Sequence, residues 1–205
     1  MISPHIHHPW HGVSVGPDAP AIVTAYIEIT PSDTVKYELD KESGILKVDR
    51  PQLYSNVVPA LYGFIPRTYC GDQIAAYCMN KTGLTGIRGD GDPLDILVLT
   101  EHRIEHCNIL VQAKPIGGFR MIDKNEADDK IIAVLQQDGM YAHYEDIRQL
   151  PPGIIDRLKH YFLTYKRSPT GAQQPVEITD VYSCAEAHEV IRASMEDYRK
   201  DYGGK

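Results

Sequence analysis

Residues 89–99 read GDGDPLDILVL, and the fold can be worked out from this stretch. Three aspartates fall within six positions, separated by a glycine and a proline that favour a tight turn. They are Asp90, Asp92 and Asp95. Like charges this close repel one another unless cations lie between them. The apolar residues 96–99 follow at once and predict a buried strand, so the stretch predicts a cation-binding turn at the edge of a core.

Carboxylate oxygens favour a hard cation such as Mg²⁺, Ca²⁺ or Mn²⁺. A calcium EF-hand loop is one alternative, because residues 90–101 have the length of that loop. It is disfavoured, since Asp95 stands where the loop requires glycine and residues 96–99 read as strand. A polar turn that binds no ligand is the second alternative, and this stretch alone leaves it open.

Composition limits the class of protein. The 205 residues predict one domain, 1–205, with residues 1–20 as an N-terminal arm. A net charge of -7 argues against nucleic acid as a partner, because phosphate backbones attract basic surfaces. No membrane partner is expected, since no apolar stretch is long enough to span a bilayer. The start of the chain does not read as a secretory signal, which predicts a cytoplasmic protein whose four cysteines are reduced thiols.

The N-terminal stretch MISPHIHHPWHG carries four histidines, which raises the question of a metal site. They are His5, His7, His8 and His11. Two prolines and a glycine break any regular element there, whereas metal ligands need a rigid frame. We therefore expect a mobile surface arm rather than a metal site.

Short strands are predicted along most of the chain. Residues 35–50 read as a β-hairpin, because apolar and charged side chains alternate before a loop at 41–44. Gly44 would provide the positive φ that the loop needs. Further strands are predicted at 21–28, 96–100, 109–113, 119–122, 131–136 and 176–181.

Two helices are predicted in the last third of the chain, at 151–167 and 185–199, because apolar residues recur there with a period near 3.6. Residues 68–89 contain four glycines and show no clear period, so they are expected to form a long loop or a small excursion from the fold. Many short strands followed by two helices predict a mainly β fold with flanking helices, arranged as a closed β-barrel.

A second acidic stretch, MIDKNEADDK at 121–130, also lies between predicted strands. Other charged and phenolic residues are spread along the chain, and each taken singly reads as a surface charge or a core tyrosine. Those of interest are Glu28, Lys36, Arg50, Tyr62, Tyr165 and Lys166. Together they suit a densely anionic substrate, because metal ions can hold some of its oxygens while Lys, Arg and Tyr donate to the others.

The order of these blocks resembles the soluble inorganic pyrophosphatases of the Mg²⁺-dependent, barrel-fold family. The matching blocks are EIT, VKYELDKESGILKVDR, YGFIP, GDGDPLDILVL, DKNEADDK and HYFLTYK, from Glu28 to Lys166. The resemblance implies a closed five-stranded OB-like β-barrel with two helices in the C-terminal half. It also implies a homo-oligomer that hydrolyses inorganic diphosphate with several Mg²⁺ ions, for which Mn²⁺ or Zn²⁺ could substitute.

The resemblance assigns roles residue by residue. Asp90, Asp95 and Asp128 correspond to ligands of the high-affinity metal site, and Asp123 to a ligand of metals that arrive with substrate. Asp92 corresponds to the general base that takes a proton from the metal-activated water. The phosphate-side groups would be Lys36, Arg50, Tyr62, Lys130, Tyr165 and Lys166, with Glu28 and Glu38 as further carboxylates of the cavity.

The sequence departs from the family pattern at three places. Val58 occupies a position, four before Tyr62, where the family often has tyrosine. The turn between Glu28 and Lys36 is shorter by one residue than in common bacterial members, and residues 68–89 form a longer segment than in compact ones.

Two other classes of function remain open. A metal-binding barrel without activity would have no use for inward-facing lysines and tyrosines. A hydrolase of nucleotides or polyphosphate would need an aromatic clamp or an open basic groove, and the sequence shows neither.

Overall fold

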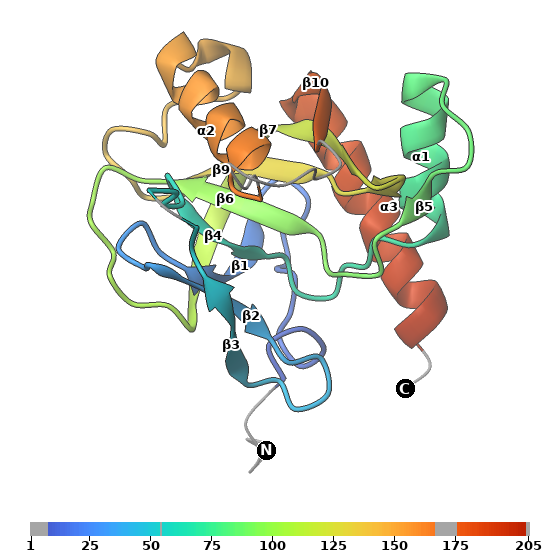
Figure 1. Ribbon diagram of the computed structural model, residues 1–205, viewed down its shortest axis with the longest axis horizontal. Coiled ribbons are helices and arrows are strands. Elements are labelled where there is room, and N and C mark those ends of the chain that lie inside the picture. Colours follow the sequence, from blue (N-terminus) through green and yellow to red (C-terminus); the bar gives the residue numbers. More distant parts are fainter. Residues whose placement is uncertain (1–7, 54, 167–175, 204–205) are drawn as a thin grey trace.

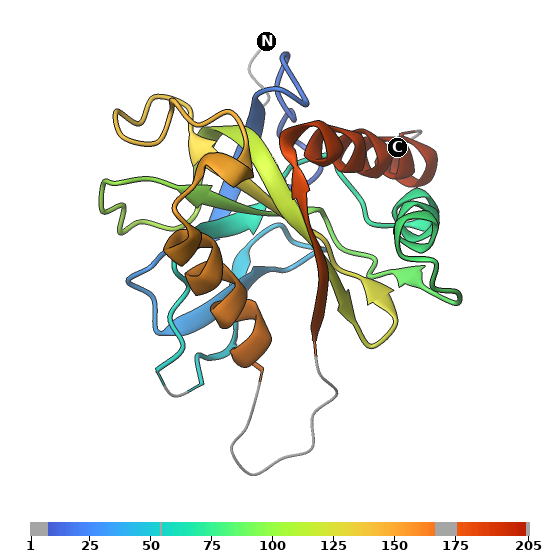
Figure 2. The same ribbon diagram turned by 90° about the horizontal axis from the view of Figure 1, so that it is seen from above.

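The computed structural model describes residues 8–53, 55–166 and 176–203, and its centre is a closed ring of five strands (Figures 1 and 2). The ring runs β1–β4–β6–β9–β7 and closes where β7 pairs with β1. The strands are β1 Val23–Ile29, β4 Leu61–Phe64, β6 Asp95–Leu99, β9 Lys130–Leu135 and β7 Ile109–Asp123. All neighbours are antiparallel except the β6–β9 pair. The predicted mainly β fold with a closed set of five strands is confirmed.

Both faces of β6 are buried over residues 96–99, which explains the uninterrupted apolar run there. Ile96 and Val98 pack in one cluster with residues of the helices α1, Asp72–Thr82, and α3, Cys184–Tyr202. Leu97 and Leu99 pack in a second cluster with residues of α2, Pro152–Thr164. Successive side chains of a strand point to opposite faces, so residues 96–99, which are covered on both faces, are all apolar.

Residues 109–123 form one long strand, which corrects the prediction of two short ones at 109–113 and 119–122. The first half of β7 pairs with β1, and the second half with β10, Glu177–Ser183. Pro115 and two glycines suggest a break in the sequence, but the structure has only an irregularity in the pairing with β9. Gly117 is required there, because a Cβ would lie 2.5 Å from the carbonyl oxygen of Tyr182.

The two predicted helices are confirmed as α2, Pro152–Thr164, and α3, Cys184–Tyr202. The predicted loop at 68–89 is wrong, because it contains a third helix, α1, Asp72–Thr82, which lies beside α3 (Figure 1). The helix has a weak amphipathic pattern, and its N-terminus has no capping side chain of its own. Its cap comes from α3, where the Asp197 carboxylate accepts hydrogen bonds from the backbone of Gly71, Gln73 and Ile74.

The predicted hairpin is confirmed as β2, Val35–Leu39, paired with β3, Leu46–Pro51, and Gly44 has a φ of 71°. The remaining elements are β5 Arg88–Gly89, β8 Glu126–Ala127 and the short 3₁₀ helix Ile147–Gln149. All four cysteines are free. Among the described residues, no helix has the length and apolar character needed to cross a bilayer.

The N-terminal segment contradicts the expectation of a mobile surface arm from residue 8 onward. Trp10 is 2% exposed, and its indole Nε1 donates to the carbonyl oxygen of Thr68 at 2.7 Å. His11 Nδ1 lies 2.8 Å from the hydroxyl of Tyr198 on α3. The sequence gives no sign of this, since the partners are far along the chain. His5 and His7 lie outside the described residues.

Candidate functional site

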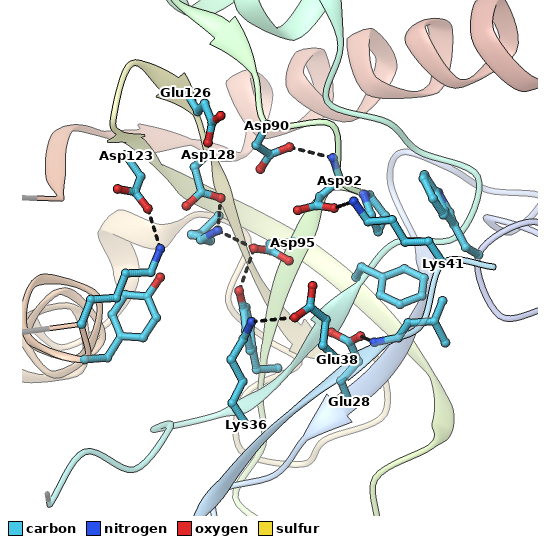
Figure 3. Close-up of a pocket in the computed structure, with 18 of the residues that line it drawn as sticks. Glu28, Lys36, Glu38, Lys41, Asp90, Asp92, Asp95, Asp123, Glu126 and Asp128 are labelled. Carbon is cyan, nitrogen blue, oxygen red and sulfur yellow. Dashed lines mark hydrogen bonds and ion pairs between the residues drawn. The ribbon is translucent and has the colours of Figure 1, made fainter. Parts of the chain in front are cut away.

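All thirteen predicted site residues line one cavity of about 200 Å³, although they come from six segments of the chain (Figure 3). They are Glu28, Lys36, Glu38, Arg50, Tyr62, Asp90, Asp92, Asp95, Asp123, Asp128, Lys130, Tyr165 and Lys166. The structure thus brings together every residue that the sequence singled out for this site. The roles assigned to them stay predictions.

The strand pairings explain why the carboxylates meet. β6 and β9 are parallel, with Asp95 opposite Lys130, so both strands begin at the same edge. β7 runs antiparallel to β9 and ends at this edge with Asp123, and Asp128 follows in the turn between β8 and β9. Asp90 lies just after β5, in the turn that leads into β6.

Lys130 occupies the centre of the carboxylate cluster. Its ammonium forms ion pairs with both Asp95 and Asp128, and Asp95 also accepts a hydrogen bond from the Tyr62 hydroxyl at 2.7 Å. Burial opposes the charge on Lys130, but these two aspartates outweigh it and raise the lysine pKa well above its usual value. Burial also raises the pKa of Asp128. The Lys130 ammonium therefore supplies positive charge between Asp95 and Asp128 in the metal-free protein.

Two further carboxylates, Glu28 and Asp90, have raised pKa values. Burial raises the pKa of Glu28 to about 8, even though its carboxylate accepts a hydrogen bond from the backbone N–H of Leu39 at 2.7 Å. Burial and the neighbouring Asp128 raise the pKa of Asp90 well above its usual value. These shifts show that the metal-free cavity disfavours its own negative charge.

Cations and a phenol line other parts of the cavity. Lys36 and Arg50 are directly opposite each other in the β2–β3 pair, and Asp49 contacts them at 3.1 Å and 2.5 Å. Lys166 forms an ion pair with Asp123 at 2.5 Å, and its ammonium lies 5.2 Å from the centre of the Tyr165 ring. These groups can donate to oxygens of an anion in the cavity.

The donor set fits Mg²⁺, because the carboxylates are hard oxygen ligands that converge on one cavity. In the part of the chain that the structure describes, no three Asp, Glu, His or Cys side chains are arranged to hold an ion. The Lys130 ammonium lies between Asp95 and Asp128 instead. Binding a metal would therefore need changes in side-chain rotamers at this cluster.

The cavity has lining residues that sequence reasoning missed. Lys41 lies in the predicted hairpin and Glu126 in the second acidic stretch, so their charge could have indicated them as site residues. Trp10 gave no such signal. The other additional lining residues are Leu39, Phe64 and Pro93.

Two residues of interest do not line the cavity. Val58, where the family often has tyrosine, is fully buried in the same hydrophobic cluster as Tyr62. Asp129, although it lies between Asp128 and Lys130, is buried away from the cavity, and burial raises its pKa to about 7. Arg120, itself 2% exposed, provides the main charge that opposes this shift.

A larger cavity of about 590 Å³ lies elsewhere, between the ends of β4 and β6 and helix α2. Among its described lining residues Glu101 is the one carboxylate. It lacks the convergence of acids and bases that marks the first cavity, so size alone does not make it the stronger candidate.

Known proteins that resemble this chain in sequence are inorganic pyrophosphatases. A sequence model described as "Inorganic pyrophosphatase" matches residues 25–199. The inorganic pyrophosphatase of Chlamydia trachomatis serovar D is 53% identical over 197 residues, which cover 94% of each chain. The soluble inorganic pyrophosphatase 3 of Arabidopsis thaliana is 42% identical over 193 residues, which cover 93% of this chain and 78% of that one.

The fold agrees as well. The crystal structure of the inorganic pyrophosphatase from Thermus thermophilus superimposes with a TM-score of 0.79 at 29% identity, covering 95% of this chain and 99% of that one. With a family match over most of the chain and relatives above half identity, the chain belongs to the inorganic pyrophosphatase family.

Proposed function

We propose that the cavity hydrolyses inorganic diphosphate to two phosphates, with Mg²⁺ as cofactor and Asp92 as general base. One observation carries the proposal: eight carboxylate side chains and only five cationic ones line this small cavity. A wall with excess negative charge can hold a multiply charged anion only if metal ions supply the missing positive charge. Family membership favours diphosphate as that anion.

The chain's own residues would divide the work in the reaction. Mg²⁺ ions, held by Asp90, Asp95, Asp123 and Asp128, would place positive charge on the phosphate oxygens and make water more acidic. Asp92 would accept the proton of the attacking water as its oxygen bonds to phosphorus and the bridging P–O bond breaks. The leaving phosphate would gain its stabilisation from Lys36, Arg50, Tyr165 and Lys166.

The cavity volume favours a small substrate over a nucleotide. At about 200 Å³ it is smaller than the roughly 300–1,000 Å³ of sites that enclose drug-sized ligands. A non-enzymatic metal-binding module would leave the cationic and phenolic wall without a purpose. Both rival classes are therefore disfavoured.

Two further points rest on the family resemblance, and a third rests on the cysteines. Mn²⁺ or Zn²⁺ could replace Mg²⁺ at oxygen ligands, with different activity. We expect a homo-oligomer. A cytoplasmic location would suit the free cysteines, because reducing compartments preserve thiols.

Phosphate release from a panel of substrates tests the proposal. Diphosphate should be hydrolysed in the presence of Mg²⁺, and chelation of the metal should abolish the reaction. ATP and tripolyphosphate should react at least about a hundredfold more slowly, because their bulk does not fit the cavity. Faster release from ATP than from diphosphate would contradict the proposal.

A further inference from the structure

The N-terminal segment and the β2–β3 loop form a chain of contacts that ends at Asp92. The segment is anchored at Trp10, which packs among Tyr26, Leu39 and Phe64 and accepts a backbone hydrogen bond from Arg67 at 2.9 Å. Trp10 also lines the cavity. The segment is thus a fixed part of the cavity wall.

His8 connects this segment to the β2–β3 loop. Its Nδ1 accepts a hydrogen bond from the backbone N–H of Trp10 at 3.2 Å, and its Nε2 lies 3.1 Å from the carbonyl oxygen of Lys41. A carbonyl can only accept, so Nε2 must carry the ring proton. Gly44 allows the ring to approach the loop, because a Cβ there would lie 2.7 Å from His8 Cδ2.

Lys41 extends the contacts from the loop to the aspartate turn. Its ammonium forms an ion pair with the Asp92 carboxylate (Figure 3). It also donates to the carbonyl oxygen of Gly91 at 3.2 Å. The backbone of this turn is held separately, since Cys70 exchanges hydrogen bonds with Asp92 and Gly91 at 2.8 Å and 3.1 Å. Cys70 therefore holds the backbone of the turn, and Lys41 is the cationic side chain that contacts the Asp92 carboxylate.

We propose that Lys41 is a positioning residue for Asp92, and that His8 holds the loop from which Lys41 reaches it. The inference rests on the proposed function in so far as it concerns turnover. Lys41 also offsets the repulsion between Asp92 and Asp90 two positions earlier, so the turn keeps its carboxylates close together. Both partners of the ion pair are about half exposed, so the pair should matter for orientation more than for stability.

Lys41→Met tests the proposal, with Lys47→Met as the matched control. Lys47 lies on the same hairpin, pairs with Asp40 and does not line the cavity. We expect Lys41→Met to lower kcat about tenfold, with KM and thermal midpoint nearly unchanged, because misorientation of a catalytic group costs rate rather than binding. Lys41→Arg should recover most of the rate, and Lys47→Met should match the wild type.

A double-mutant cycle separates positioning from direct substrate binding. If Lys41 acts through Asp92, adding Lys41→Met to Asp92→Asn should change kcat by less than about twofold. An additional loss equal to that in the wild type, or a rise in KM alone, would overturn the proposal and place Lys41 on the substrate.

Hydrogen exchange of the metal-free protein gives a readout that needs no turnover. His8→Ala should speed amide exchange in residues 40–45, while His102→Ala, at an exposed site, should not. Unchanged exchange in His8→Ala would overturn the role of His8. A wild type that releases no phosphate from diphosphate would instead refute the proposed function, and the exchange result would still decide the loop contact.

Discussion

Asp92 and Asp95 are only three positions apart, yet they have different surroundings. Asp95 contacts Lys130 and Tyr62 within the carboxylate cluster, whereas Asp92 contacts Lys41 from the hairpin loop. Neighbours in one motif therefore have different partners within the same cavity. This difference supports a division of roles, with Asp95 as a ligand and Asp92 as the base.

Asp92→Asn should lower kcat by roughly 10² to 10⁴, the usual effect of losing a general base, while Mg²⁺ binding survives. The remaining rate should rise with pH, because bulk hydroxide can partly replace the base. Measurement of kcat across pH at saturating Mg²⁺ checks this. Full rescue by excess metal would show that Asp92 is a ligand instead.

Asp138 lies outside the site and stabilises a turn. Its carboxylate accepts hydrogen bonds from the Thr100 hydroxyl at 2.7 Å and from the backbone of Glu101, Met140 and Tyr141 at 2.8–2.9 Å. Despite burial, these donors lower its pKa to about 2, from 3.8. Because the folded pKa is the lower one, the stabilisation is complete above about pH 4 and is lost as the pH falls toward 2.

Asp138→Asn should therefore lower the free energy of unfolding by about 2 kcal/mol at neutral pH. The side-chain nitrogen of the asparagine would face two hydrogen-bond donors where the aspartate has an acceptor oxygen. Urea unfolding at about pH 7, 5 and 3 should show the difference shrinking at the lowest pH. Asp156→Asn, at an exposed position of α2, provides the control. A difference that does not vary with pH would contradict the electrostatic explanation.

At the level of residues, the site was predictable because its acidic and basic side chains are grouped in short blocks of the sequence. All thirteen predicted residues lie at the cavity. Lys41 was missed because a lysine in a hairpin loop normally reads as a solvated charge. Trp10 was missed because its partners, such as Thr68, are set by the fold.

Helix α1 shows how one element can depend on another. The N-cap residue before it, Gly71, offers no side chain to cap the helix, and backbone N–H groups of Gly71 and the first turn donate to Asp197 of α3. Asp197 has no exposed surface, so water cannot replace it. The cap is therefore a tertiary contact between two helices.

Asp197→Ala should lower the free energy of unfolding by about 2–3 kcal/mol, because several buried donors lose a charged acceptor together. Protection from hydrogen exchange should fall first in α1. Glu196→Ala removes a neighbouring carboxylate that is more than half exposed and serves as the control. Equal losses in the two variants, measured by urea unfolding, would contradict the capping role.

Elements with a strong local period were predictable, and those defined by distant contacts were not. The hairpin, α2 and α3 have their pattern in their own residues. The pattern of α1 is weak, and its cap lies more than a hundred positions away. Pro115 and its glycines indicated a break in β7, but pairing with β9 and β10 continues past them.

On the scale of the whole molecule, the closed ring brings the ends of its strands together around the cavity. The β6–β9–β7 edge supplies aspartates, and the separate β2–β3 hairpin supplies cations across from them. The strand pattern predicted a closed barrel, and the family resemblance predicted five strands in it, but strand patterns do not specify which strands pair. The fold therefore holds carboxylates from several strands close together in one cavity, where they repel one another.

Mg²⁺ should accordingly stabilise the whole protein. A ligand that binds only the folded state adds RT ln(1 + [L]/Kd), or about 2.7 kcal/mol at a concentration of 100 Kd. We expect Mg²⁺ to raise the thermal midpoint and chelator to reverse the rise. Ca²⁺, another hard cation, should also stabilise the protein, because the effect depends on charge at oxygen ligands.

Asp90→Asn connects this effect to the cavity. Burial raises the pKa of Asp90, so its ionised form is unfavourable in the metal-free protein, and its removal should increase stability without Mg²⁺. The same variant should lose much of the midpoint rise that Mg²⁺ causes in the wild type, because one ligand is missing. Asp156→Asn should behave like the wild type in both conditions. If Asp90→Asn kept the full rise, the stabilising ions would have to bind outside this cavity, and the proposed metal site would be wrong.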